Sequence, residues 1–211
     1  VIGVPIGVQY ALEVWVFAIS SLLIGRLGAI ALSGHQIALN LASLTFMVPL
    51  GIGAAAASRV GNAIGASDPD GARRAAKAAL LLGAAMMVAS ASLFVLVPGP
   101  LAALYTSDPG VLAVAVTLLP IAALFQIFDG TQAVAFGALR GAADTRVPTA
   151  IYIVGFWFVG LPTGYLSAFR FGYGAAGIWY GFIAGLGSVA LLAAWRVAWR
   201  FRKSSTLTRV V

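Results

Sequence analysis

The sequence has no cysteine, a single histidine and very few charges: only 9% of its 211 residues are Asp, Glu, Lys or Arg. The lack of cysteine excludes disulfides, thiolate metal sites and a cysteine nucleophile. A soluble domain carries about 25% charged residues. This chain is instead 61% hydrophobic, with a mean hydropathy of +1.00. The composition predicts an integral membrane protein.

Enzyme and nucleotide motifs are also lacking. The sequence contains no HExxH, no GxSxG and no Walker lysine motif, so we expect neither hydrolytic chemistry nor ATP binding, and no organic cofactor. Lys and Arg outnumber Asp and Glu by 13 to 6. These cations lie at the ends of apolar runs and form no continuous patch, which argues against a nucleic-acid partner.

Six charge-poor runs predict an all-α, polytopic membrane protein, since each run is long enough for a helix to cross a bilayer. No ten-residue alternation typical of a membrane β-barrel recurs. Proline inside four of the spans predicts kinks, at Pro5, Pro49, Pro120 and Pro162. We expect the spans at about 3–25, 36–58, 78–98, 111–138, 147–168 and 173–195, with residues 1–200 as one unit and 201–211 as a basic tail.

Lys and Arg predict the orientation of these spans. With Val1 placed in the cytoplasm, the outer segments contain only Arg26 and Arg170. Every other Lys and Arg then lies inside, as the positive-inside rule requires. We therefore expect a multi-pass protein of the cell membrane with both ends of this segment cytoplasmic, and a basic tail that also contacts anionic membrane lipid.

Two acids lie inside the expected spans. Glu13 is near the middle of the first, and Asp129 is the only ionisable residue between Asp108 and Arg140. A carboxylate in the middle of a span costs about 2.5–3.5 kcal/mol on insertion scales, so such residues usually serve a function. Each can hold a proton in one state and a cation in another, and both are oxygen ligands suited to Na⁺. A protonated, hydrogen-bonded structural role is the alternative.

Amide side chains accompany both acids. Gln9 lies one turn before Glu13, whereas Gln126 and Gln132 flank Asp129 at spacings of three. Asn40 lies one turn beyond Gln36 and faces either a cavity or another helix. These polar stripes predict a shared wet cavity that binds a cation, with Gln9, Asn40, Gln126 and Gln132 beside the two acids.

The remaining candidates are the histidine and the aromatic residues. His35 follows Gly34 in the expected first outer turn, which favours a cap or interfacial role over a proton relay. Tryptophans are expected to pack or to lie at the interface, and these are Trp15, Trp157 and Trp179. Some phenyl rings are expected to line a pocket and contact a cation; the candidates are Phe17, Phe125, Phe128, Tyr152 and Phe156.

Three stretches occur together in an order and spacing that resemble a known family: "PIGVQYALEVWVF", "AAAASRVGNAIGASDPDGARRAA" and "FDGTQAVAFGALRGAADTRVP". They resemble the C-terminal lobe of multidrug and toxic compound extrusion (MATE) transporters, over residues 1–200. The glutamate of the first stretch and the aspartate of the third match acids of the NorM-like branch, here Glu13 and Asp129.

The resemblance implies one six-helix lobe of a twelve-helix transporter, which is paired with an N-terminal lobe absent from this chain. It implies secondary active antiport, in which organic cations or drugs leave in exchange for H⁺ or Na⁺ by a rocker-switch movement of the lobes. The loops "GNAIGASDPDGARR" and "LRGAADTRVP" would then be cytoplasmic, with Asp68 or Ser67 capping the helix that follows.

Other readings stay open. A flippase for lipids or lipid-linked saccharides shares this helical architecture, although a large anionic headgroup favours cationic cavity residues. A non-transporting membrane half-module is the second alternative. The sequence starts at Val1, at the edge of a span, so we expect it to be part of a longer polypeptide.

Overall fold

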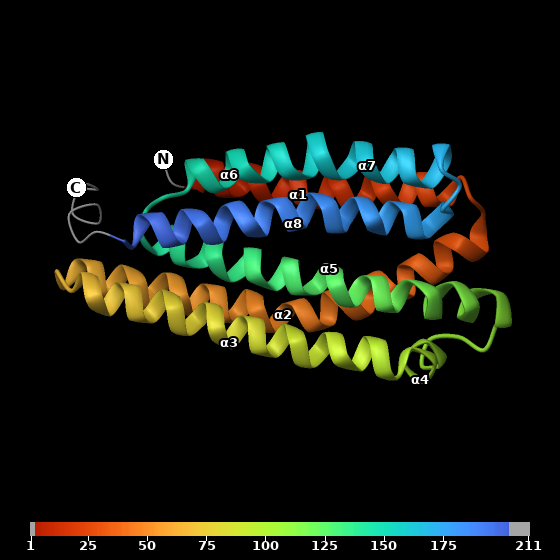
Figure 1. Ribbon diagram of the computed structural model, residues 1–211, viewed down its shortest axis with the longest axis horizontal. Coiled ribbons are helices and arrows are strands. Elements are labelled where there is room, and N and C mark those ends of the chain that lie inside the picture. Colours follow the sequence, from red (N-terminus) through yellow and green to blue (C-terminus); the bar gives the residue numbers. More distant parts are fainter. Residues whose placement is uncertain (1–2, 203–211) are drawn as a thin grey trace.

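The computed structural model describes residues 3–202 and is an elongated bundle of long helices that run along its main axis (Figure 1). The described residues contain no strand. The chain order is α1 Gly3–Gly25, α2 Ala29–Gly65, α3 Pro69–Leu96, α4 Pro98–Ala103, α5 Pro109–Gly141, α6 Arg146–Tyr152, η1 Ile153–Gly160, α7 Leu161–Tyr165, η2 Leu166–Arg170 and α8 Gly174–Arg200.

Six helices within residues 3–202 are long and apolar enough to span a membrane, which confirms the predicted all-α class. The fifth span, Arg146–Arg170, is one continuous rod assembled from α6, η1, α7 and η2. Its two π-helical stretches were not predicted. The second span is longer than expected, because α2 begins at Ala29 and ends at Gly65. We expect a basic tail at residues 201–211, and its residues from 203 onward lie outside the described part of the chain.

Two long helices start on an aspartate followed by proline. The Asp68 carboxylate accepts a hydrogen bond from the Gly71 N–H at 2.8 Å, and the Asp108 carboxylate accepts one from the Val111 N–H at 2.9 Å. An aspartate cap satisfies one of the free N–H groups of the first turn, and proline there loses nothing because its position needs no donor. The predicted cap at Asp68 is confirmed. Ser67 has a φ of 57° and bonds through its backbone instead.

Glycine lets α2 and α5 touch along one stretch. A Cβ on Gly137 would overlap the backbone of Gly53, and one on Gly141 would lie 2.5 Å from the Ala57 carbonyl oxygen. Helices in membranes associate by such close packing, because lipid supplies no hydrophobic driving force between them. A second close approach joins α8 to the fifth span, where a Cβ on Gly181 would overlap Gly164.

Helix α2 bends near its middle (Figure 1), and Pro49 lies inside this helix. Proline removes one backbone hydrogen bond and crowds the preceding turn, which accounts for a bend at this level. Pro120 likewise lies inside α5. The kinks expected at Pro5, Pro120 and Pro162 stay predictions.

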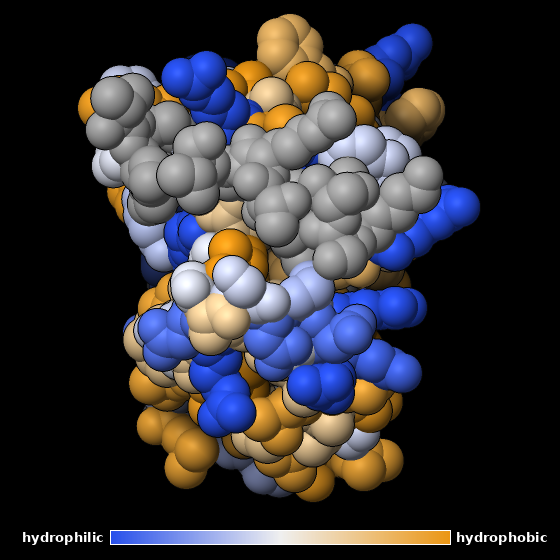
Figure 2. Space-filling view, turned by 90° about the vertical axis from the view of Figure 1, so that its left-hand side faces the viewer, coloured by the Kyte–Doolittle hydropathy of each residue, from blue (hydrophilic) through white to orange (hydrophobic). Residues whose placement is uncertain are grey.

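Hydrophilic side chains gather at one end of the bundle (Figure 2). That end contains the α2–α3 turn, the start of α6 and the end of α8 (Figure 1). The sequence places Arg73, Arg74, Lys77, Arg146 and Arg200 in or next to these segments, so we call this the basic end, and it fits the positive-inside pattern. The cytoplasmic assignment of this end stays a prediction.

Candidate functional site

A cavity of about 230 Å³ lies among α1, α2 and α5. Glu13 enters it from α1 and Asp129 from α5, although 115 residues separate them in the chain. The remaining wall comes mainly from apolar side chains. Its complete lining is Glu13, Val14, Phe17, Leu39, Ala42, Ser43, Phe46, Phe125 and Asp129. The two intramembrane acids therefore share one hollow.

The two carboxyl groups differ in exposure. Asp129 is buried, with 7% of its surface exposed, whereas Glu13 is half-buried at the side of the cavity. Within residues 3–202, neither carboxyl group has a hydrogen bond or an ion pair to another side chain. Two carboxylates facing one small hollow repel each other when both are charged, so a cation or a proton between them is favourable.

Ser43 is a third polar side chain in the cavity wall, beside the two acids, and the sequence analysis did not identify it. Its hydroxyl donates to the Leu39 carbonyl at 2.8 Å, which leaves the lone pairs of the hydroxyl oxygen free to accept. Hard cations prefer oxygen ligands of this kind. Ser43 lies three residues after Asn40, so the helical spacing was present in the sequence, but a serine in a membrane helix is too common to single out.

Gln126 is used structurally. Its Oε1 accepts hydrogen bonds from the Thr45 hydroxyl at 2.7 Å and the Ser90 hydroxyl at 3.1 Å, so this side chain joins α5 to α2 and α3. Its Nε2 is buried and has no partner among residues 3–202. The amide is one turn from Asp129, yet it does not line the cavity.

The other predicted amides also lie outside the cavity wall. Gln9 and Gln132 are buried on α1 and α5, and the Gln132 Oε1 has no hydrogen-bond partner in the described part of the chain. Asn40 is exposed on α2 and accepts a hydrogen bond from the Tyr105 hydroxyl at 2.8 Å. Direct cation contact by Gln9, Asn40, Gln126 or Gln132 stays a prediction, without support from the cavity geometry.

His35 is fully buried, so its expected position at an interface or cap is wrong. Helix α2 begins at Ala29, about two turns earlier than the sequence indicated, which moves His35 into the helix interior. Its Nδ1 accepts a hydrogen bond from the Trp179 indole N–H at 3.2 Å, and its Nε2 lies 3.2 Å from the Ser21 hydroxyl. The ring thus joins α2 to α8 and α1.

Aromatic rings form part of the wall of the cavity that contains Glu13 and Asp129. Phe17 and Phe125 line it and meet edge to face, with centroids 6.3 Å apart, and Phe125 packs on the buried Trp179 at 5.4 Å. Phe46 was not among the predicted lining residues. Phe128, Tyr152 and Phe156 were, but they do not line this hollow. Trp179 packs as predicted, whereas Trp15 is largely exposed.

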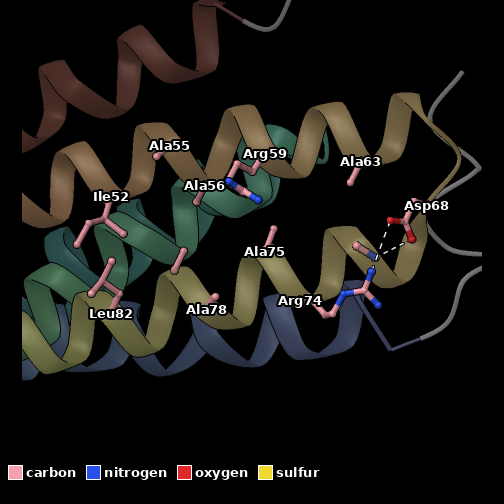
Figure 3. A pocket seen from close by; sticks show the side chains of 12 residues that line it. Ile52, Ala55, Ala56, Arg59, Ala63, Asp68, Arg74, Ala75, Ala78 and Leu82 are labelled. Carbon is pink, nitrogen blue, oxygen red and sulfur yellow. Dashed lines mark hydrogen bonds and ion pairs between the residues drawn. The ribbon is translucent and has the colours of Figure 1, made fainter.

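A larger groove of about 610 Å³ lies between α2 and α3 near the basic end (Figure 3). Half of its lining residues are alanines, and the Arg74 side chain lies near Asp68 with an N–O distance of 3.6 Å. Asp68 therefore serves as the predicted cap, and it also forms an ion pair with Arg74 that was not predicted.

Within the described residues no group of three or more His, Cys, Asp and Glu side chains could hold a metal ion. Glu13 and Asp129 bring two carboxyl groups to one cavity, and Ser43 adds a hydroxyl oxygen beside them.

Comparisons with known proteins agree with this architecture. A sequence model of the MatE family matches residues 5–166. The multidrug resistance protein NorM of Burkholderia vietnamiensis is 50% identical over 200 residues, which are 92% of this chain and 43% of that protein. The multidrug resistance protein MdtK of Edwardsiella ictaluri is 42% identical over 206 residues, 96% of this chain and 45% of that protein.

Solved structures of similar fold are also transporters. The eukaryotic MATE transporter AtDTX14 superposes with a TM-score of 0.91 at 26% identity, over 100% of this chain and 48% of that one. The Vibrio cholerae MATE transporter VcmN gives 0.86 at 17% identity, over 96% of this chain and 46% of that one, a likeness of fold alone. The chain spans less than half the length of the curated relatives it matches.

Proposed function

This chain belongs to the MatE family, and we propose that it forms the C-terminal six-helix lobe of a multidrug exporter that exchanges organic cations for H⁺ or Na⁺. The proposal extends the names of its relatives, which are multidrug resistance proteins, to a chain that spans less than half their length. The protein is then a transporter of the cell membrane rather than an enzyme, and a second six-helix lobe is its partner.

The observation that supports this proposal best is the shared position of Glu13 and Asp129 in one hollow. When deprotonated, the two carboxylates attract an organic cation, and the rings of Phe17 and Phe125 add apolar and cation–π contact. The low-dielectric surroundings strengthen each of these attractions relative to water.

Exchange follows from competition for the same negative charge. A proton or a sodium ion that binds the carboxylates removes the charge that holds the drug, so the drug leaves. Alternating access by rocking of two lobes places the first event on one side of the membrane and the second on the other. Ser43 would supply an additional oxygen to a bound Na⁺.

The test uses everted membrane vesicles that contain the intact protein, with ethidium as the cation and an imposed pH or sodium gradient. We expect gradient-driven uptake in the wild type, and loss of uptake in Asp129→Asn and Glu13→Gln at equal protein level. Asp70→Asn is the matched control, since Asp70 is an exposed acid of the first turn of α3.

Each outcome is informative. Full uptake in Asp129→Asn makes that acid structural and contradicts the proposed site. The same loss in Asp70→Asn would mean that any change of acidic charge is harmful, which also contradicts it. A wild type that moves no ethidium under either gradient favours a lipid flippase or a non-transporting half-module.

A further inference from the structure

A second groove, here called the α3–α8 groove, has a volume of about 500 Å³ and opens near the basic end of the bundle. Helix α3 forms one wall, α8 forms the other, and Thr131 of α5 contributes to the lining between them. Most of its lining is apolar. The complete lining is Arg73, Ala76, Lys77, Leu80, Leu81, Ala84, Thr131, Ala194, Val197, Ala198, Phe201 and Arg202.

Three cations and no acid line this groove: Arg73, Lys77 and Arg202. Arg73 and Lys77 lie one helical turn apart on α3, so they face the same side. Within residues 3–202 none of the three has a hydrogen bond or ion pair from its side chain. Unpaired cations concentrated at one end of an apolar groove attract an anion that also has an apolar part.

The apolar part of the groove covers most of one leaflet of a bilayer. Lys77 and Ala84 are 7 positions apart on α3, which corresponds to about 10 Å at the helical rise of 1.5 Å per residue. Half of a bilayer hydrocarbon core is about 15 Å. The part of an acyl chain nearest its headgroup therefore fits along the apolar wall, with the charged headgroup at the basic residues.

The groove also opens on the side of α5 that faces away from the acid cavity. Thr131 and Asp129 are two residues apart on α5, which separates their side chains by about 200° around the helix axis. Leu81, in the α3 wall, is 62% exposed. A lipid bound here does not compete with a cation bound at Glu13 and Asp129.

The α2–α3 groove of Figure 3 lacks this arrangement, although it is larger. Its Arg74 is already paired with Asp68, and that acid lies in the lining itself. A carboxylate at the mouth repels an anionic headgroup. Arg59 is the remaining cation of that lining.

We propose that the α3–α8 groove binds one anionic phospholipid, whose headgroup phosphate contacts Arg73, Lys77 and Arg202 and whose acyl chain packs on Leu80, Val197 and Phe201. The tail that follows Arg202 contains Lys203 and Arg209 and no acid. The tail therefore carries the same positive charge as the mouth of the groove. Charge repulsion disfavours the tail as the occupant, and charge complementarity favours an anionic lipid.

The experiment measures phosphatidylglycerol binding to the intact protein in a non-ionic detergent by native mass spectrometry. The test variant is Arg73→Gln with Lys77→Gln, and the matched control is Arg59→Gln with Arg74→Gln, which removes two cations from the α2–α3 groove. We expect about fivefold weaker binding for each cation removed in the test variant. The control should bind within about twofold of the wild type, since its cations serve the other groove.

A third variant, Ala198→Phe, fills the groove while retaining its cations. We expect it to lose phosphatidylglycerol binding as well, whereas a surface that attracts anions by charge alone would keep it. Unfolding temperatures of all variants are recorded, so that a folding defect is not mistaken for a lost site.

Several results would overturn the proposal. These are unchanged binding in the test variant, an equal loss in test and control, and equally tight binding of phosphatidylcholine. Displacement of the lipid by glycerol 3-phosphate at equal concentration would show a site for free phosphate instead. Retained binding in Ala198→Phe would exclude acyl-chain contact with the groove.

Discussion

Helices α2 and α5 run side by side, yet two stretches of the same pair behave in opposite ways. Near the basic end, Gly53 and Gly137 bring the two backbones into contact and leave no room for a side chain. Nearer the middle, Ser43 and Phe46 face Phe125 and Asp129 across a cavity. Pro49 lies on α2 between the two stretches. The comparison shows that a tight helix–helix contact and a cavity can follow each other along one helix pair when a proline bends one of the helices between them.

The largest loss of stability is expected from a substitution where the backbones of α2 and α5 touch. Gly137→Ala would place a Cβ against the backbone of Gly53, which cannot move aside like a side chain. We expect a loss of about 3 kcal/mol, at the upper end for overpacking, measured as a lower unfolding temperature of the detergent-solubilised protein. Gly51→Ala is the control, because nothing lies within 4 Å of a Cβ at Gly51. Equal effects of the two changes would contradict the tight contact.

A somewhat smaller loss is expected at the other end of α2. His35→Phe keeps the ring volume but leaves the Trp179 indole N–H without its acceptor. A buried donor without a partner costs about 1–3 kcal/mol. The double change with Trp179→Phe removes both polar groups and should recover part of that loss. If Trp179→Phe lowers the stability by the same amount in the His35→Phe variant as in the wild type, the two residues are not coupled.

Pro49→Ala sharpens the comparison, since it alters the bend and removes neither acid. A straighter α2 should approach α5 and narrow the cavity, so we expect weaker ethidium binding with an unchanged or higher unfolding temperature. Equilibrium binding of ethidium to the purified intact protein measures the first, and thermal unfolding measures the second. A wild-type affinity for ethidium in Pro49→Ala would show that the shape of the cavity does not depend on the bend in α2.

The smallest effect is expected outside both stretches, at the α2–α3 turn. Asp68→Ala removes the carboxylate that accepts from the Gly71 N–H and pairs with Arg74. Loss of an N-cap costs about 1 kcal/mol, and the exposed ion pair adds little. Asp68→Asn should retain most of the stability, since asparagine is an equally good cap. A loss in Asp68→Asn as large as in Asp68→Ala would assign the effect to the charge.

The sequence predicts the helices well and their rotation poorly. Long apolar runs identify all six spans, and the acids at Glu13 and Asp129 stand out because charge in a span is costly. Which side of each helix faces inward is harder to read, since a membrane helix is apolar all round. Gln126 shows the consequence: its spacing from Asp129 suggested the cavity, but its partners are Thr45 and Ser90.

Local packing explains the remaining differences. His35 was placed too near the surface because no cap residue marks the start of α2, whose N-cap position is Gly28 without a side-chain bond. Ser43 and Phe46 line the cavity from the turns of α2 that precede Pro49, and no sequence signal distinguishes this side of an apolar helix. The π-helical stretches of the fifth span have no sequence signal that we recognise, although Gly155 and Gly160 allow close contact with α8 there.

The hydrogen bonds of Gln126 also bear on how the protein is made. Its partners Thr45 and Ser90 lie on α2 and α3, which leave the ribosome before α5. When the newly synthesised α5 enters the bilayer with Gln126 and Asp129, both hydroxyl partners are already at membrane depth. The order of synthesis thus places the hydrogen-bond partners of Gln126 in the membrane before the span that contains this amide.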